Sequence, residues 1–180
     1  MKKILIAFLT VSAIVFSGCG KDEWSDGDPA YEHIYYFGFE NWGTFKNDVK
    51  FDVVRENTIG IPVQFHSERV RDYDVVAYYY VAGTAVRGTD YQIVDESGNV
   101  LSPDANGAFS MVWPNAVKGV KDIYVKALNG ATGTFLVQTF DPNAAVPISN
   151  TDVSSTTNNK TEEYEVRAFS QNYKVTVTIK

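Results

Sequence analysis

Residues 173–180 read Tyr-Lys-Val-Thr-Val-Thr-Ile-Lys, and this stretch decides the fold class. In an extended chain its apolar side chains would point to one side, and its lysines and threonines to the other. A period of two is typical of a half-buried strand and does not fit an amphipathic helix. The sequence therefore ends in a predicted β-strand.

The same alternation recurs from Tyr31 onward, with many Val, Ile, Tyr, Phe and Thr residues and no helical period. Residues 59–65 alternate clearly, but Pro62 lacks the N–H that a strand ladder uses, so we expect this strand at a sheet edge or with a bulge. The other predicted strands are residues 31–37, 50–55, 74–81, 90–94, 109–113, 121–128, 134–140 and 163–169. About ten short strands in a chain of this length predict an all-β, antiparallel β-sandwich.

Turn signals separate several of these strands. Asn129-Gly130 lies between two of them and predicts a hairpin with a type I′ turn, because both residues tolerate a positive φ. Residues 97–99 and 106–107 carry further turn residues. Residues 141–162 hold two prolines and a run of Ser, Thr and Asn with little to bury, so we expect a long loop there, either mobile or functional.

Length and composition describe a soluble globular chain. It has 180 residues, of which 44% are hydrophobic and 21% charged. These values exclude a disordered chain, a coiled coil and a multi-span membrane protein. One domain fills this length, and the strands place it at residues 31–180.

The N-terminus predicts export and lipidation. Two lysines precede the mostly apolar residues 4–16, which are too few to span a bilayer and suit a signal peptide. Residues 16–19, Phe-Ser-Gly-Cys, resemble the lipobox of bacterial lipoproteins, with Phe16 where leucine is usual. The resemblance implies that residues 1–18 are a lipoprotein signal peptide and that Cys19 is acylated and anchors the chain in a lipid membrane.

Residues 19–30 are predicted to form a flexible tether. Lys21, Asp22 and Glu23 resemble the lysine-plus-acid export signal that sends lipoproteins of Bacteroidetes to the outer face of the outer membrane. This resemblance implies a lipid-anchored protein exposed at the cell surface, with a periplasm-facing anchor as the alternative.

The charge of the mature chain limits its partners. Removal of residues 1–18 takes away two of the 16 Lys and Arg residues and none of the 22 Asp and Glu residues, which leaves a net charge of −8. Nucleic acid is not an expected partner, because its phosphates require a concentrated basic face. Cys19 is the only cysteine, so no disulfide forms within the chain and burial must stabilise the fold.

A second resemblance lies in residues 81–91, which read Val-Ala-Gly-Thr-Ala-Val-Arg-Gly-Thr-Asp-Tyr. They resemble the Calx-beta signature, in which a strand ends in Gly-Thr-Ala, turns through a glycine and resumes with Asp-Tyr. Gly83 and Gly88 would relieve strain at a sharp corner, Asp90 would bond turn amides, and Tyr91 would fill the core. The resemblance implies an immunoglobulin-like sandwich.

The Calx-beta resemblance extends more faintly over residues 49–180. The lipobox, the acidic tether, the aromatic residues 34–37 and the sandwich together resemble lipoproteins of gut Bacteroidetes. Calx-beta domains bind calcium or serve adhesion, but the acids that hold calcium are replaced here by residues 129–132, Asn-Gly-Ala-Thr. Calcium takes six to eight oxygen ligands, of which Asp95, Glu96 and Asp141 could supply a few. We name no metal ligand and no cofactor, and the sequence leaves open whether calcium is bound.

Catalytic motifs are not found in the sequence. It lacks a nucleophile elbow, a phosphate loop, a His-Glu-x-x-His motif and a dinucleotide fingerprint. His33 and His66 are its two histidines, and we expect both at strand surfaces. With no catalytic residues to name, we expect a protein that is not an enzyme.

Aromatic residues make up 14% of the chain, and aromatic rings stack on sugars or anchor protein contacts. Trp42 in a predicted loop and Trp113 at a predicted strand end are candidate ligand-binding residues, with packing onto the core as the alternative for each. Residues 74–81 carry tyrosines on both faces, which indicates a central covered strand or an exposed tyrosine patch.

Two hypotheses of function remain. The first is a surface-anchored binding module, accessory to the capture of polysaccharide, which predicts exposed aromatic side chains. The second is a structural or adhesive protein that engages surface proteins, which predicts an open sheet edge or an apolar patch.

Overall fold

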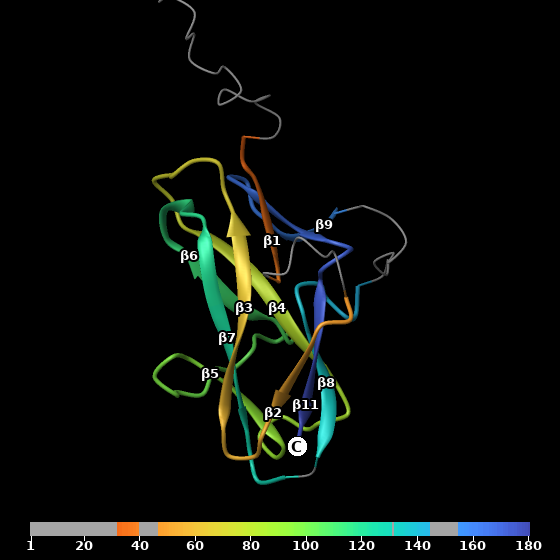
Figure 1. The fold of residues 1–180 in the computed structure, drawn as a ribbon. Helices are drawn as coiled ribbons and strands as arrows, with labels where there is room; N and C mark the ends of the chain where they lie inside the picture. The colour runs from red at the N-terminus through yellow and green to blue at the C-terminus, as the bar shows by residue number, and fades with distance from the viewer. Residues whose placement is uncertain (1–31, 40–46, 131, 145–154) are drawn as a thin grey trace, which may run out of the picture. The chain divides into compact units, whose positions relative to one another are not determined.

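Strands arranged in two sheets make up the described part of the chain. The computed structural model describes residues 32–39, 47–130, 132–144 and 155–180, and residues His33–Lys180 form a compact unit. The six-stranded sheet has the order β5-β7-β3-β1-β10-β9, and the five-stranded sheet has the order β2-β11-β8-β4-β6. Together they form an all-β sandwich, as predicted (Figure 1).

The elements are β1 Ile34–Phe39, β2 Lys50–Val53, β3 Thr58–His66, β4 Val75–Gly83, β5 Tyr91–Val94, β6 Phe109–Trp113, the short 3-10 helix η3 Pro114–Ala116, β7 Gly119–Ala127, β8 Gly133–Gln138, β9 Ser155–Lys160, β10 Glu165–Phe169 and β11 Lys174–Ile179. Each of the predicted strands is found, with ends that differ by at most three residues. No helix in this part of the chain is long and apolar enough to cross a membrane.

Two strand pairings differ from the expected antiparallel arrangement. β1 pairs in parallel with β10, and β2 pairs in parallel with β11, whereas the remaining pairings are antiparallel. Both sheets are therefore mixed. The prediction was wrong here because the alternation of side chains is the same for either strand direction.

The core is a layer of aromatic and branched side chains between the sheets. Trp113 is among its largest side chains, with 2% of its surface exposed and its ring stacked on Phe65 at 4.9 Å and edge-on to Phe37 at 6.4 Å. Stacked and edge-to-face ring pairs add stabilisation beyond the apolar area that they bury. In the absence of a disulfide, this packing holds the two sheets together.

Pro62 lies in the central strand β3, where the sequence predicted an edge or a bulge. The last described pair between β1 and β3 joins Phe39 to Val63, and the residues that follow Phe39 lie outside the described part of the chain. On its other side β3 continues its pairing with β7 through Pro62 and Asp122 without a register shift. The prediction of an edge strand or a bulge is therefore wrong, because β3 lies between β7 and β1 and keeps its register with β7 at Pro62.

The corner at residues 81–91 carries β4 of one sheet into β5 of the other. Gly83 has a φ of 153°, and a Cβ there would lie 2.7 Å from Cα of Phe135. Asp90 accepts a hydrogen bond from the backbone N–H of Val86 at 2.7 Å. Tyr91 is 5% exposed and stacks on Phe135 at 4.2 Å. The roles expected of Gly83, Asp90 and Tyr91 in turning the chain and filling the core are therefore found.

The predicted hairpin at Asn129-Gly130 is wrong. β7 belongs to the six-stranded sheet and β8 to the five-stranded sheet, so the chain crosses between sheets here, and neither residue has a positive φ. The glycine serves a close approach instead, because a Cβ at Gly130 would lie 2.6 Å from the carbonyl oxygen of Thr89.

The prediction of a loop over residues 141–162 is wrong at residues 155–160, which form strand β9. Its register with β10 shifts between Val166 and Arg167, which leaves Asn158 as an extra residue on β9. Such a bulge breaks the alternation of side chains. As a result the consecutive residues Asn158 and Asn159 both reach β4 of the other sheet.

These two asparagines replace a missing strand beside β4. β8 pairs with β4 at residues 80–83, and the backbone of residues 76–78 bonds instead to side chains of β9 and of Tyr164. The side chain of Asn158 accepts from Tyr78 N at 2.8 Å and donates to Tyr78 O at 2.7 Å, while Asn159 donates to Val76 O at 2.8 Å. Polar β9 therefore stabilises the sandwich through hydrogen bonds and not through apolar burial.

We expect Asn158→Ala to destabilise the protein by about 2–3 kcal/mol, because the N–H and C=O of Tyr78 would lose their partners in a partly buried seam. Ser155→Ala, on the same strand, is the control and should change the free energy of unfolding by less than about 0.5 kcal/mol. Urea unfolding followed by circular dichroism measures both. Equal stability of the two variants would contradict this role of Asn158.

Candidate ligand-binding face

Most of the site residues named from the sequence lie outside the described residues. These are Cys19, Lys21, Asp22, Glu23 and Trp42.

Trp113, the remaining candidate, is described and is buried in the core against Phe65, with Lys121 Nζ 4.8 Å from the centre of its ring. Its ring is not available for a ligand, so the alternative of core packing holds for Trp113.

The tyrosines of β4 divide between the two faces of their sheet. Tyr79 is 2% exposed and stacks on Phe109 at 5.2 Å in the core. Tyr78 lies half-buried on the outer face, and Tyr80 on that face is 9% exposed. β4 is therefore a largely covered strand between β8 and β6, which agrees with the first of the two interpretations of residues 74–81.

Two tyrosine hydroxyl groups and a histidine form a hydrogen-bonded cluster at the end of the sandwich where β1 begins. The hydroxyl of Tyr73 lies 2.8 Å from Nδ1 of His33 and 2.7 Å from the hydroxyl of Tyr35, and the Tyr73 ring stacks on Tyr164 at 5.9 Å. Burial, followed by the hydrogen bond with Tyr35, raises the pKa of Tyr73. Tyr73 therefore stays protonated and joins β1 to the β3–β4 connection as a structural hydrogen-bonding group.

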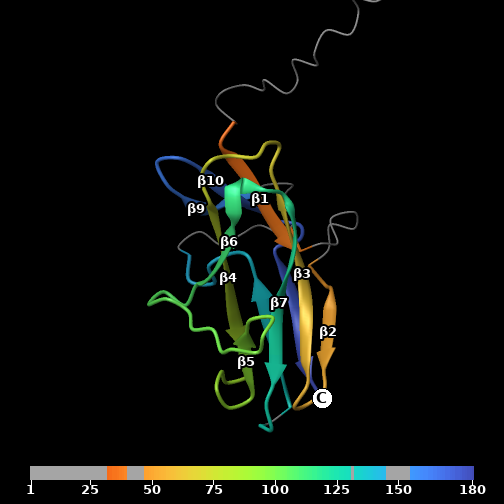
Figure 2. The ribbon, with the colours of Figure 1, turned by 90° about the vertical axis from the view of Figure 1, so that its left-hand side faces the viewer.

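The outer face of the six-stranded sheet gathers aromatic and charged side chains over its last three strands. Tyr36 on β1 pairs with Arg167 on β10, which pairs in turn with Thr157 on β9, and in the next row Glu165 pairs with Lys160. We call this surface the β1–β10 face; it comprises Tyr36, Thr157, Lys160, Glu165, Arg167 and Phe169. β1 begins at the same end as the β3–β4 connection, and the C-terminus lies at the opposite end (Figures 1 and 2).

An aromatic pair forms one part of the β1–β10 face. The rings of Tyr36 and Phe169 lie 4.8 Å apart with an angle of 4° between their planes. Both are half-buried, and their neighbours along the chain, Phe37 and Ala168, lie in the core with no exposed surface. Two paired strands thus hold the rings in place, which gives an apolar surface little freedom to lose on binding a ligand.

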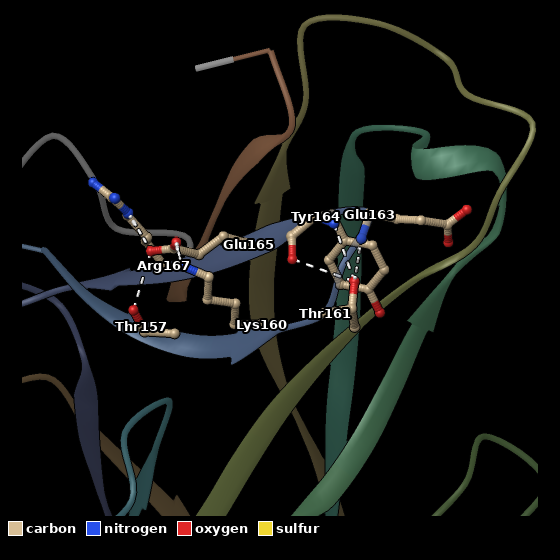
Figure 3. Close-up of polar contacts among 7 residues, drawn as sticks. All are labelled: Thr157, Lys160, Thr161, Glu163, Tyr164, Glu165 and Arg167. Atoms are coloured by element: carbon tan, nitrogen blue, oxygen red, sulfur yellow. Dashed lines mark hydrogen bonds and ion pairs between the residues drawn. The ribbon is translucent and has the colours of Figure 1, made fainter. Parts of the chain in front are cut away.

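A carboxylate with three partners forms the other part. One oxygen of Glu165 accepts from Arg167 Nε at 2.7 Å and from the hydroxyl of Thr157 at 3.0 Å, and its second oxygen lies 3.3 Å from Lys160 Nζ. Figure 3 shows Glu165 between these side chains on the β9–β10 hairpin. Its side chain is 14% exposed, against 32% for Arg167 and 68% for Lys160, so the cations lie closer to solvent than the carboxylate between them.

The surroundings of Glu165 favour its ionised form. Burial, the strongest single influence, would raise its pKa, but the hydrogen bonds from Arg167, Thr157 and Lys160 together outweigh it and lower the pKa below the ordinary 4.5. Glu165 is therefore a fixed negative charge at neutral pH. Its hydrogen bond to Nε orients the guanidinium of Arg167, and the far end of that group extends away from the other residues drawn in Figure 3.

Sequence reasoning missed this face. Tyr36, Glu165, Arg167 and Phe169 stand at the outward positions of two predicted strands, where aromatic and charged residues alternate with the core positions. That pattern was the available signal. The pairing of β1 with β10, which joins residues about 130 positions apart, is not visible in a single sequence.

The edge strand β6 is partly protected against pairing with a strand of another protein. Val112 on this outermost strand is 44% exposed, but Lys121 Nζ donates a hydrogen bond to its carbonyl oxygen. Lys121, which lies on β7 of the other sheet, thus occupies a carbonyl group that an added strand would need. This observation weighs against strand addition at β6.

Among the described residues, no group of three or more His, Cys, Asp and Glu side chains could hold a metal ion. No protein-family model matches the chain, and no curated protein matches its sequence.

Glu165→Gln should lower the free energy of unfolding by about 1 kcal/mol at pH 7, because it removes a charged acceptor from three donors. The folded protein holds the pKa of Glu165 below 4.5, so this contribution is present above pH 4.5 and is lost as the pH falls through the lower folded value. Urea unfolding at pH 7 and pH 3 should therefore show a difference that shrinks at the lower pH.

Glu68→Gln, at an exposed position between β3 and β4, is the control and should alter stability little at either pH. A difference for Glu165→Gln that stays constant from pH 7 to pH 3 would show that the carboxylate is not held as described.

Proposed function

We propose that the protein is a lipid-anchored, extracytoplasmic binding module that captures polysaccharide at the cell surface without acting on it as an enzyme. The observation that carries the proposal is the β1–β10 face, where the stacked rings of Tyr36 and Phe169 lie beside the hydrogen-bonded group around Glu165. Aromatic surface and fixed polar groups together are what a sugar requires, since a sugar presents C–H faces and hydroxyl groups.

The rigidity of the face supports this role. Tyr36 lies on a strand with a neighbour on each side, β3 and β10, and its backbone register is fixed by pairs with both His66 and Arg167. Groups presented from paired strands are held more precisely than groups on loops. A ligand would meet side chains that are already in place, so little conformational entropy is lost when it binds.

The proposed anchor follows from the N-terminal sequence. Acyl chains on Cys19 contribute about 0.8 kcal/mol for each buried methylene group, and a single chain gives only marginal membrane binding, so several chains are required. Residues 19–30 would then link the membrane to the sandwich, with Lys21, Asp22 and Glu23 as the export signal to the outer surface.

Cys19→Ser should abolish acylation, because serine has no thiol to form the thioether. Cells fed radiolabelled palmitate should label the wild-type chain and not the variant, and the variant should leave the membrane fraction. Digestion of intact cells by a protease should remove the wild-type protein if it faces outward. Labelling of Cys19→Ser at the wild-type level would overturn the proposed anchor.

Tyr36→Ala should weaken polysaccharide binding at least about 10-fold, because it removes half of the aromatic pair and exposes one face of Phe169. Affinity electrophoresis of the whole protein through gels that contain single polysaccharides measures the effect. Tyr124→Ala, on β7 of the same sheet, is the matched control and should bind as the wild type does. Failure of the wild type to bind any polysaccharide in a broad panel would exclude this function.

A further inference from the structure

We infer that the polysaccharide bound by the β1–β10 face is acidic, and that Arg167 receives its carboxylate or sulfate groups; this inference rests on the function proposed above. It comes from the way in which Arg167 is held. One guanidinium nitrogen, Nε, is bonded to Glu165 at 2.7 Å, and this is the nitrogen nearest the backbone. The two terminal nitrogens make no hydrogen bond to the described residues and belong to a side chain that is 32% exposed.

The terminal nitrogens form a planar fork of N–H donors. Such a fork matches the two oxygens of a carboxylate, or two oxygens of a sulfate ester, through a pair of parallel hydrogen bonds. A free arginine on a surface would lose rotamer freedom when it binds. Here the bond to Glu165 already restricts the side chain, so less entropy remains to be lost.

The local charge favours an anion. Arg167 and Lys160 both contact the carboxylate of Glu165, so the group contains two cations and one anion. Glu165 is the less exposed member, and its oxygens are occupied by Arg167, Thr157 and Lys160. An incoming acid would thus meet donors first and would be attracted by the one uncompensated positive charge.

The aromatic ring beside the arginine completes the argument for a sugar acid. Tyr36 is the direct cross-strand neighbour of Arg167, and paired side chains on one face of a sheet lie close together. A sugar ring against Tyr36 would therefore bring its acidic substituent to Arg167. Thr157, the neighbour of Arg167 on the other side, adds a hydroxyl group on the same face.

The experiment compares matched acidic and neutral polymers on the whole acylated protein in a neutral detergent. In the methyl ester of polygalacturonate the carboxylates are esterified and carry no charge, and dextran is dextran sulfate without its sulfate groups. We expect tighter binding to at least one acidic polymer than to its neutral partner, and the better of the two acids identifies the group that Arg167 receives.

Arg167→Gln should weaken binding of the acidic polymer about 10- to 100-fold, which corresponds to the loss of a pair of charged hydrogen bonds. Arg55→Gln, an exposed arginine in the β2–β3 turn, removes the same charge elsewhere and should bind normally. Arg167→Lys keeps the charge without the fork and should recover little of the affinity. Thermal unfolding checks that each variant is folded.

The Glu165→Gln variant tests whether Glu165 orients the guanidinium of Arg167 or only contributes its negative charge to the face. If Glu165 orients Arg167, this variant binds the acidic polymer more weakly, although it removes a negative charge; tighter binding would overturn the inference. Equal binding of acidic and neutral polymers, with loss only in Tyr36→Ala, would refute the acidic ligand and leave the proposed function intact. Binding of no polymer at all would refute both.

Discussion

The position of β1 between β3 and β10 is the constraint on which the outer face of the larger sheet depends. Tyr36 faces outward because Tyr35 and Phe37, on either side of it, are 2% and 0% exposed in the core. A slip of one residue would bury Tyr36 and expose both of these rings, at a cost of several kcal/mol of apolar burial. The core thus fixes the register that places Tyr36 beside Arg167, and the interior packing determines the exterior surface.

The bulge in β9 links the stability of the sandwich to the same face. Because Asn158 is an extra residue, Asn158 and Asn159 both turn toward β4, while Thr157 keeps its place opposite Arg167. The bulge therefore lets the six-residue strand β9 contact both sheets. The side-chain amides of Asn158 and Asn159 bond to the backbone of β4, and the hydroxyl of Thr157 donates to Glu165 on the outer face. Polar residues suit this strand because both tasks are hydrogen bonding and neither is apolar burial.

The sequence predicted the parts of the fold that depend on local alternation and missed those that depend on distant partners. Ten strands follow from periods of two, and the corner at residues 81–91 follows from its glycines and Asp90. β9 was missed because its residues, Ser-Thr-Thr-Asn-Asn-Lys, lack the apolar alternation by which the other strands were recognised. The hairpin prediction at Asn129-Gly130 was wrong because this dipeptide lies where the chain crosses from β7 in one sheet to β8 in the other. For the site, Trp113 attracted attention as a rare residue, whereas the β1–β10 face arises from pairing across most of the chain.

The net charge of −8 that we expect once residues 1–18 are removed would oppose the approach of an acidic polymer. Two considerations make that repulsion secondary to the local contact. Exposed charges farther apart than about 8–10 Å are largely screened at physiological ionic strength, whereas a bound acid would lie about 3 Å from the guanidinium of Arg167. In addition, the negative charge of Glu165, which contacts Arg167, is already paired with Arg167 Nε at 2.7 Å and with Lys160 Nζ at 3.3 Å. The long-range field would slow association, but the geometry at Arg167 would decide which acids stay bound, because dissociation depends on the hydrogen bonds that must break.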